Sequence, residues 1–184
     1  KAISISDDEL NSFLSRFKLG FETIRRVDNP SIRAVTTHKV YDASGKVTGE
    51  ISMSLSDTES NGTNKLFDMA PIFVKALSSR RVLVIDEFGS SMHPMMTRML
   101  ISLFNSKETN PMGSQLIFTT HDTNLLDNKF LRRDQIWFTE KDETASTDLY
   151  SLVEFKDASG VKVRNDRSYE KDYINGRYGA IPYL

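Results

Sequence analysis

The stretch RVLVIDEFGSSMHP, residues 81–94, decides the fold and raises the question of function. Four apolar residues, Val82 to Ile85, run directly into two acids, Asp86 and Glu87. Such a run predicts a buried strand of a parallel sheet, and parallel strands deliver their last residues to the carboxyl edge, where ligands bind. Because side chains alternate along a strand, the two carboxylates start out pointing apart and can serve two different purposes.

The two acids suit a nucleotide site. Asp86 can hold Mg²⁺, directly or through water, since Mg²⁺ prefers oxygen ligands and keeps several of its waters. Glu87 can orient a water molecule and polarise it for attack on a γ-phosphate. The plain alternative is a strand end that is capped by solvated acids.

Two other segments could belong to the same site. QLIFTTHD, residues 115–122, reads as a second apolar strand that ends at His121, a side chain that can hydrogen-bond a γ-phosphate or simply a backbone carbonyl. In ESNGTNKLF, residues 59–67, Ser60, Asn61 and Gly62 precede an amphipathic helix. A helix N-terminus offers unpaired N–H groups to an anion, although a serine there is usually only an N-cap.

The remaining pattern predicts an α/β fold with a largely parallel sheet flanked by helices, preceded by an N-terminal helix and a β-hairpin. Ser6 and Glu9 form a capping box at the start of the first helix. The expected elements are a helix over 6–18, a hairpin over 31–55 with its turn at 42–45, helices over 63–77 and from Pro94, strands over 135–141 and 149–155, and a helix over 168–175. We expect residues 1–55 to lead into a lobe formed by residues 56–184.

Composition narrows the class of protein. The 184 residues include no cysteine and carry a net charge of −1, which favours neither disulfides nor a globally basic nucleic-acid binder. No apolar run approaches the roughly 18 residues of a membrane helix, and no signal peptide is visible, so we expect a cytoplasmic protein without membrane contact. The chain begins with Lys1, and we expect it to be a piece of something longer.

A phosphate-binding P-loop, G-x-x-x-x-G-K-[ST], does not occur in the sequence. The one Gly-Lys pair, Gly45-Lys46, has Val40 where the first glycine should stand, and Val47 follows it. The chain therefore has the acids and a candidate phosphate sensor, but its phosphate cradle must come from elsewhere.

Taken together, these motifs resemble the C-terminal lobe of ATP-binding-cassette (ABC) type P-loop ATPase heads. The likeness is to the subgroup related to the chromosome-maintenance (SMC) and Rad-fifty ATPases and to the OLD-like abortive-infection ATPases of bacterial anti-phage defence, AAA-family ATP-binding proteins of the RloA and PtuA kind. It runs from about Ser6 to Leu184. It rests on the ordered series SNGT (60–63), VLVIDE (82–87), SSMHP (90–94), TTHD (119–122) and the tail YINGRYGAIPYL (173–184).

The resemblance implies a role for each motif. Asp86 would be the Walker B magnesium acid, Glu87 the catalytic base and His121 the switch histidine. The signature motif and the D-loop would contact ATP held by an opposite head; the motif residues are Ser60, Asn61, Gly62 and Thr63 in the signature, and Ser90, Ser91 and His93 in the D-loop. Gly89, where many relatives carry aspartate, and His93, where transporters carry aspartate, depart from the pattern.

The resemblance also implies cofactors and partners. These are ATP with Mg²⁺, a second head in a dimer that closes around ATP, a missing N-terminal Walker A lobe, and an effector protein that is a nuclease or a toxin; DNA is a further candidate. The whole protein would hydrolyse ATP, as a regulator of anti-phage defence or as a DNA-repair or chromosome-maintenance head, while this chain alone would be inactive.

Several alternatives stay open. A metal-dependent nuclease would need more carboxylates near Asp86 and Glu87, and Asp122 is the one candidate; a non-catalytic interaction module is a third possibility. The tail could pack Tyr178, Ile181 and Tyr183 onto the body as a structural strap, or could dock a partner. The small basic patch is either solvated surface or a DNA contact. Its members are Lys129, Arg132 and Arg133.

Overall fold

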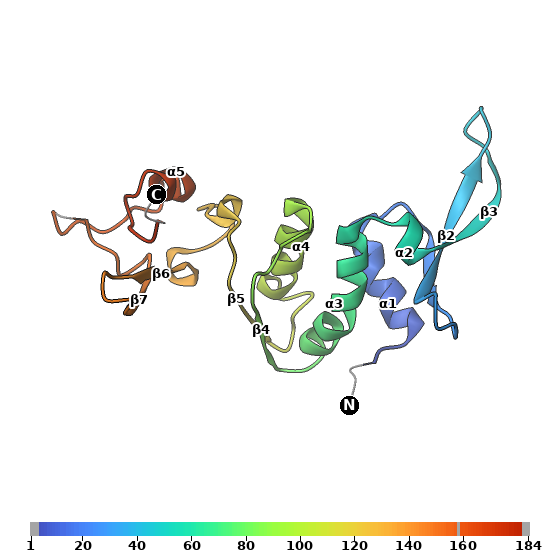
Figure 1. The fold of residues 1–184 in the computed structure, drawn as a ribbon, viewed down its shortest axis with the longest axis horizontal. Helices are drawn as coiled ribbons and strands as arrows, with labels where there is room; N and C mark the ends of the chain where they lie inside the picture. Colours follow the sequence, from blue (N-terminus) through green and yellow to red (C-terminus); the bar gives the residue numbers. More distant parts are fainter. Residues whose placement is uncertain (1–3, 158, 182–184) are drawn as a thin grey trace. The chain divides into compact units, whose positions relative to one another are not determined.

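The computed structural model describes residues 4–157 and 159–181. The chain forms two compact units, one from Lys1 to His121 and one from Asp122 to Leu184 (Figure 1). The boundary expected after residue 55 falls inside the first unit and stays a prediction about the lobes of a head. The proposed ATPase motifs lie in the first unit, apart from Asp122 of the TTHD stretch and the tail.

The first helix, α1 (Asp7–Leu14), begins where the sequence predicted. The Ser6 hydroxyl accepts the Glu9 N–H at 3.1 Å, and the Glu9 carboxylate accepts the Ser6 N–H at 2.8 Å, so the predicted capping box is confirmed. The helix is shorter than expected and continues as a 3₁₀ turn, η1 (Ser15–Phe17). It ends because Lys18 takes a left-handed conformation, with φ of 49°, before Gly20 is reached.

The predicted hairpin is confirmed and belongs to an antiparallel sheet of order β1-β2-β3. Its strands are β1 (Thr23–Arg26), β2 (Ala34–Tyr41) and β3 (Val47–Ser54). At the turn the Asp42 carboxylate accepts N–H groups of Ser44 and Lys46, at 2.9 and 3.0 Å. Figure 1 shows β2 and β3 extending away from the helices of this unit, and Ile51 of β3 is accordingly 45% exposed.

The segment that carries the motifs forms a helix and then a strand–helix–strand unit. After the short α2 (Leu55–Thr58) come α3 (Asn61–Leu77), β4 (Val82–Ile85), α4 (Pro94–Asn105) and β5 (Gln115–Phe118). β4 and β5 pair in parallel, with Ile85 opposite Phe118. Pro94 occupies the first turn of α4, as predicted, since proline needs no N–H partner there.

The largely parallel sheet predicted from the sequence is wrong for the described residues. They form three small sheets, and β4–β5 is the one parallel pair. Strand connection explains the difference: α4 crosses between β4 and β5, whereas short turns join the other neighbours and make them antiparallel. β4 is also not buried on both faces, because Val82 and Val84 are 55% and 70% exposed.

An aromatic core joins these elements and holds the turn after β4. Phe73 of α3 is fully buried, and its ring centroid lies 6.2 Å from Phe13, 6.0 Å from Phe88 and 5.7 Å from Phe104. Phe88 also contacts Phe118 of β5 at 5.3 Å. Because Phe88 directly follows the acid pair, this core fixes the position of the candidate site.

The second unit is built around an antiparallel hairpin. Its elements are η2 (Thr123–Leu125), η3 (Arg133–Gln135), β6 (Trp137–Lys141), β7 (Thr147–Ser151) and α5 (Tyr169–Ile174). Phe138 of β6 stacks on Tyr173 and Tyr178, with centroids 5.4 and 5.7 Å apart. Among the residues that the structure describes, no helix has the length and apolar character needed to cross a membrane.

Candidate functional site

The two acids leave β4 beside the end of β5, as the sequence predicted. Asp86 and Glu87 are exposed and follow Ile85, whose neighbour on β5 is Phe118. Thr119 then hydrogen-bonds across the gap: its hydroxyl donates to the Asp86 carboxylate and accepts the Glu87 N–H at 2.8 Å. The carboxyl ends of both strands therefore meet in one group of polar residues.

The backbone at Glu87 turns sharply. Its φ of 49° is left-handed, which is uncommon for a residue with a side chain. The next residue is anchored, since the Phe88 N–H donates to the Thr119 carbonyl at 2.8 Å and the Phe88 ring is buried. Glu87 is thus set in place by its neighbours while its own carboxylate stays exposed to solvent.

His121 lies two residues beyond Thr119 and is exposed. It therefore leaves β5 at the same edge at which Asp86 and Glu87 leave β4. The structure gathers these three predicted residues at one sheet edge, and Thr119, which the sequence analysis did not single out, connects the two strands there.

The signature residues form the start of α3, two residues earlier than predicted. The Ser60 hydroxyl accepts the Thr63 N–H at 3.1 Å and lies 3.0 Å from the Thr63 hydroxyl, so Ser60 is the N-cap. Asn61 is exposed in the first turn, whereas Gly62 is buried. A Cβ on Gly62 would lie 3.5 Å from the Ser91 carbonyl oxygen, an ordinary van der Waals distance, so the signature lies in contact with the D-loop of its own chain.

A lysine ties the same two segments together. The Lys65 ammonium group donates to the Ser90 carbonyl at 2.7 Å and to its hydroxyl at 2.8 Å. The sequence analysis missed Lys65, because nothing in the pattern of α3 distinguishes it from an ordinary surface lysine. The signature and the D-loop form a second polar group, which the turn at 86–90 links to the first.

The structure explains the residue types at the two D-loop positions that depart from the family pattern. Gly89 has a φ of 90°, and a Cβ there would lie 2.9 Å from the Thr97 side chain, so the aspartate of many relatives would not fit. His93 is the N-cap of α4, and its Nδ1 accepts the Met95 N–H at 3.2 Å. A contact of His93 with nucleotide stays a prediction.

Two arginines in and beside the β-sheet of the first unit contact the signature helix α3. Arg33 reaches α3 with one guanidinium nitrogen 2.6 Å from the Asp68 carboxylate and another 2.8 Å from the Asn64 side chain. Arg26 and Arg33 both lie 5.9 Å from the centre of the Phe67 ring. The N-terminal helix and sheet thus support the signature rather than forming a separate body.

Asp122, the extra acid of the nuclease alternative, caps a helix. Its carboxylate accepts the Asn124 N–H at 3.0 Å at the start of η2. Within residues 4–157 and 159–181, no group of three or more histidines and acids is arranged to hold a metal ion.

The tail packs as a strap in the described residues. Tyr178 is 1% exposed, and its hydroxyl donates to the Asp172 carboxylate at 3.0 Å. The hydrogen bonds from Arg167 hold the pKa of Asp172 below its usual range, and burial raises the pKa of Tyr150 to about 12. Ile181 stays 42% exposed, and Tyr183 lies outside the described residues.

The basic patch is partly used within the second unit. Arg132 makes hydrogen bonds to both oxygens of Asp134, at 3.0 and 2.9 Å, and Arg133 donates to the Val163 carbonyl. Lys129 is exposed. DNA contact at this patch stays a prediction.

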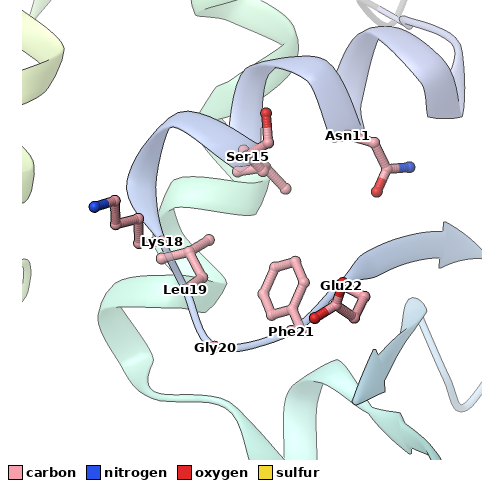
Figure 2. Close-up of a pocket in the computed structure, with 8 residues that line it drawn as sticks. Asn11, Ser15, Lys18, Leu19, Gly20, Phe21 and Glu22 are labelled. Atoms are coloured by element: carbon pink, nitrogen blue, oxygen red, sulfur yellow. The ribbon is translucent and has the colours of Figure 1, made fainter. Parts of the chain in front are cut away.

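A small pocket lies beside α1, away from these groups. Figure 2 shows it between the end of α1 and the start of β1, with a volume of about 140 Å³. The Asn11 amide that points toward it is already committed, because it bonds both backbone polar groups of Ile24 at 2.8 Å. No predicted site residue lines the pocket, whose lining is Asn11, Leu14, Ser15, Lys18, Leu19, Gly20, Phe21 and Glu22.

Comparisons with known proteins give a family and a similar fold. A family model described as "AAA domain, putative AbiEii toxin, Type IV TA system" matches residues 4–127. A solved structure from work on the ATP-driven dimerization and DNA stimulated activation of SMC ATPases is similar at a TM-score of 0.51 and 13% identity, over 79% of this chain and 81% of that chain. At such low identity the likeness shows the fold alone. No curated protein matches the sequence.

Proposed function

This chain belongs to the AAA-domain family whose model matches residues 4–127, and on that premise we propose that it is the signature-bearing lobe of an ATP-hydrolysing head. The observation that supports this most is the edge where β4 and β5 end, where Thr119 bonds to Asp86 and Glu87 and His121 follows two residues along the chain. The similarity in fold to an SMC ATPase supports the same conclusion.

The residues present suit a magnesium-bound triphosphate. Asp86 offers a carboxylate that is exposed and shares one oxygen with Thr119, which leaves oxygen lone pairs for a hard cation. Bound Mg²⁺ would neutralise charge on the phosphates. Glu87 accepts a proton from the attacking water, and His121 hydrogen-bonds the terminal phosphate.

The phosphate cradle, in this proposal, lies in a segment outside the 184 residues, since they contain no P-loop motif. Ser60, Asn61, Gly62 and Thr63 then face a nucleotide bound by an opposite head, where the N-terminus of α3 attracts its charge. ATP would close two heads together and hydrolysis would release them. The contact of Gly62 with Ser91 and the hydrogen bonds of Lys65 to Ser90 support a joint movement of the signature and the D-loop in this closure.

We further propose that the head serves bacterial anti-phage defence and controls a nuclease or toxin effector. The family description, which refers to a toxin and a toxin–antitoxin system, supports this role. The second candidate is a DNA-repair or chromosome-maintenance head, which the SMC-like fold favours. Fold and motif chemistry are shared by both roles, so the effector distinguishes them.

The proposal is tested by ATP hydrolysis in the full-length protein. We expect Mg²⁺-dependent hydrolysis, a shift from monomer to dimer on adding ATP, and loss of both Mg²⁺-dependent binding and turnover in Asp86→Ala. The 184-residue chain alone should hydrolyse no ATP. Metal-dependent DNA cleavage by this chain alone, abolished in Asp86→Ala, would instead identify a nuclease and refute the proposal.

A further inference from the structure

Thr119 directs every polar group that it has toward the acid turn. Its N–H donates to the Ile85 carbonyl at 3.1 Å, and its carbonyl accepts the Phe88 N–H at 2.8 Å. Its hydroxyl accepts the Glu87 N–H at 2.8 Å and donates to the Asp86 carboxylate. One residue at the end of β5 thus holds the whole of the turn that follows β4.

The direction of these bonds follows from their chemistry. A backbone N–H can only donate, so the Thr119 hydroxyl must accept from Glu87, and its own hydrogen is then free to go to the Asp86 carboxylate. The same oxygen therefore orients one acid through its side chain and the other through its backbone. A serine could make both bonds, whereas the equally shaped valine could make neither.

We propose that Thr119 is a positioning residue for ATP hydrolysis, an inference that rests on the function proposed above. It orients the Asp86 carboxylate for Mg²⁺ and holds Glu87 in its left-handed conformation, so that the catalytic base points where the attacking water lies. Hydrogen bonds from neighbouring groups to a metal-binding carboxylate are worth about 10- to 100-fold in metal affinity or activity.

The role is separable from folding. Thr119 is exposed, and the Phe88 ring and the two backbone hydrogen bonds hold the turn without the hydroxyl. Thr119→Val should therefore fold normally while losing both hydroxyl bonds. Thr119→Ser should keep them and serves as the matched control.

The first measurement is steady-state ATP hydrolysis by the full-length protein over a range of Mg²⁺ concentrations. We expect Thr119→Val to lower kcat by about 10- to 100-fold and to raise the Mg²⁺ concentration needed for half-maximal rate. Thr119→Ser should restore kcat to within about threefold of the wild type, because the hydroxyl is the group that matters.

The second measurement does not depend on activity. Amide hydrogen exchange followed by NMR in the 184-residue chain should show faster exchange at Glu87 in Thr119→Val, by about tenfold or more, since that N–H loses its acceptor. The Phe88 amide, which bonds to a backbone carbonyl, should keep its exchange rate. Thr119→Ser should exchange like the wild type at both positions.

Three results would overturn the inference. These are wild-type kcat and Mg²⁺ dependence in Thr119→Val, a serine variant as impaired as the valine variant, or unchanged Glu87 exchange in the valine variant. In each case the ATPase proposal would stand, because the wild type would still hydrolyse ATP. Absence of hydrolysis in the wild-type protein would instead refute the proposed function, and this role for Thr119 with it.

Discussion

Asp86 and Asp172 are aspartates with opposite surroundings. Asp172 is 8% exposed and accepts hydrogen bonds from Arg167 and Tyr178, with Arg177 3.7 Å away. Asp86 is exposed and receives the Thr119 hydroxyl. Both lie in polar clusters, but one carboxylate is satisfied by its own chain and the other retains capacity for a ligand. The difference in burial and hydrogen bonding is what favours a structural role for Asp172 and a ligand-binding role for Asp86.

We expect the largest effect, on the rate of ATP hydrolysis, from a change in the exposed acid pair. In the full-length protein, Glu87→Gln should lower kcat by about 10²- to 10⁴-fold, because a positioned general base contributes on that scale. The variant should still bind ATP and accumulate as a closed dimer. Hydrolysis rates and light scattering measure the two properties.

The matched control is Glu143→Gln, which changes an exposed acid in the β6–β7 turn and should leave kcat unchanged. If Glu87→Gln hydrolysed ATP at the wild-type rate, Glu87 would not be the base, and the exposed acids would no longer differ in kind from Asp172.

A change at the buried Asp172 should instead alter the folding stability of the second unit. Asp172→Ala removes the partner of Arg167 and Tyr178, and we expect the free energy of unfolding of the second unit to fall by about 2–4 kcal/mol. Trp137 is the one tryptophan in the sequence and lies in that unit, so its fluorescence in urea reports the transition. Asp166→Ala, which breaks an exposed pair with Arg164, should change it by less than about 0.5 kcal/mol. An equal response of the two variants would contradict the structural role.

Lowering the pH should also show the structural part that Asp172 plays, through the stability of the second unit. The hydrogen bonds from Arg167 depress the pKa of Asp172 in the folded state, so its contribution to stability is present above the unfolded pKa of about 3.9 and is lost as pH falls through the folded value. We therefore expect the urea concentration at the unfolding midpoint of the second unit to decrease when the pH is lowered below about 4. Asp172→Ala should weaken this dependence. A pH profile identical in both proteins would show that other carboxylates account for it.

The smallest effect should come from Lys65. Lys65→Met keeps the length of the side chain but removes its bonds to Ser90, and we expect a cost of about 0.5–1 kcal/mol in unfolding of the first unit. ATP turnover in the full-length protein should fall a few-fold, because the signature and D-loop lose one connection. Lys75→Met on the same helix is the control. Equal turnover in the two variants would mean that Lys65 has no special part.

The strongest local signals in the sequence predicted structure well. Ser6 with Glu9 marked the start of α1, and the apolar run before Asp86 marked β4, because a capping box and an apolar run are both residue patterns a few positions long. β1 was missed since it spans Thr23–Arg26 and buries one side chain, Ile24. The extent of the sheet was overestimated because an apolar run shows that a strand is hydrophobic and does not show how many partners it has.

The site was predicted as a set of motifs, and its connections were not. Asp86, Glu87 and His121 were identified from strand ends, but the hydroxyl that bonds to both Asp86 and Glu87 belongs to Thr119, which the register between β4 and β5 places beside them. A register across strands cannot be read from either strand alone. Lys65 escaped for the same reason, because Ser90 is brought to it by the fold.

The left-handed backbone at Glu87 sets stability against activity at a single position. A side chain in that conformation costs roughly 1 kcal/mol or more, and glycine would avoid the cost. Selection for robustness alone would therefore replace this glutamate, and Glu87→Gly should unfold at a higher urea concentration while losing its carboxylate. Glu87 is therefore a position at which the protein has lower folding stability than glycine would give, and at which the proposed chemistry needs the carboxylate.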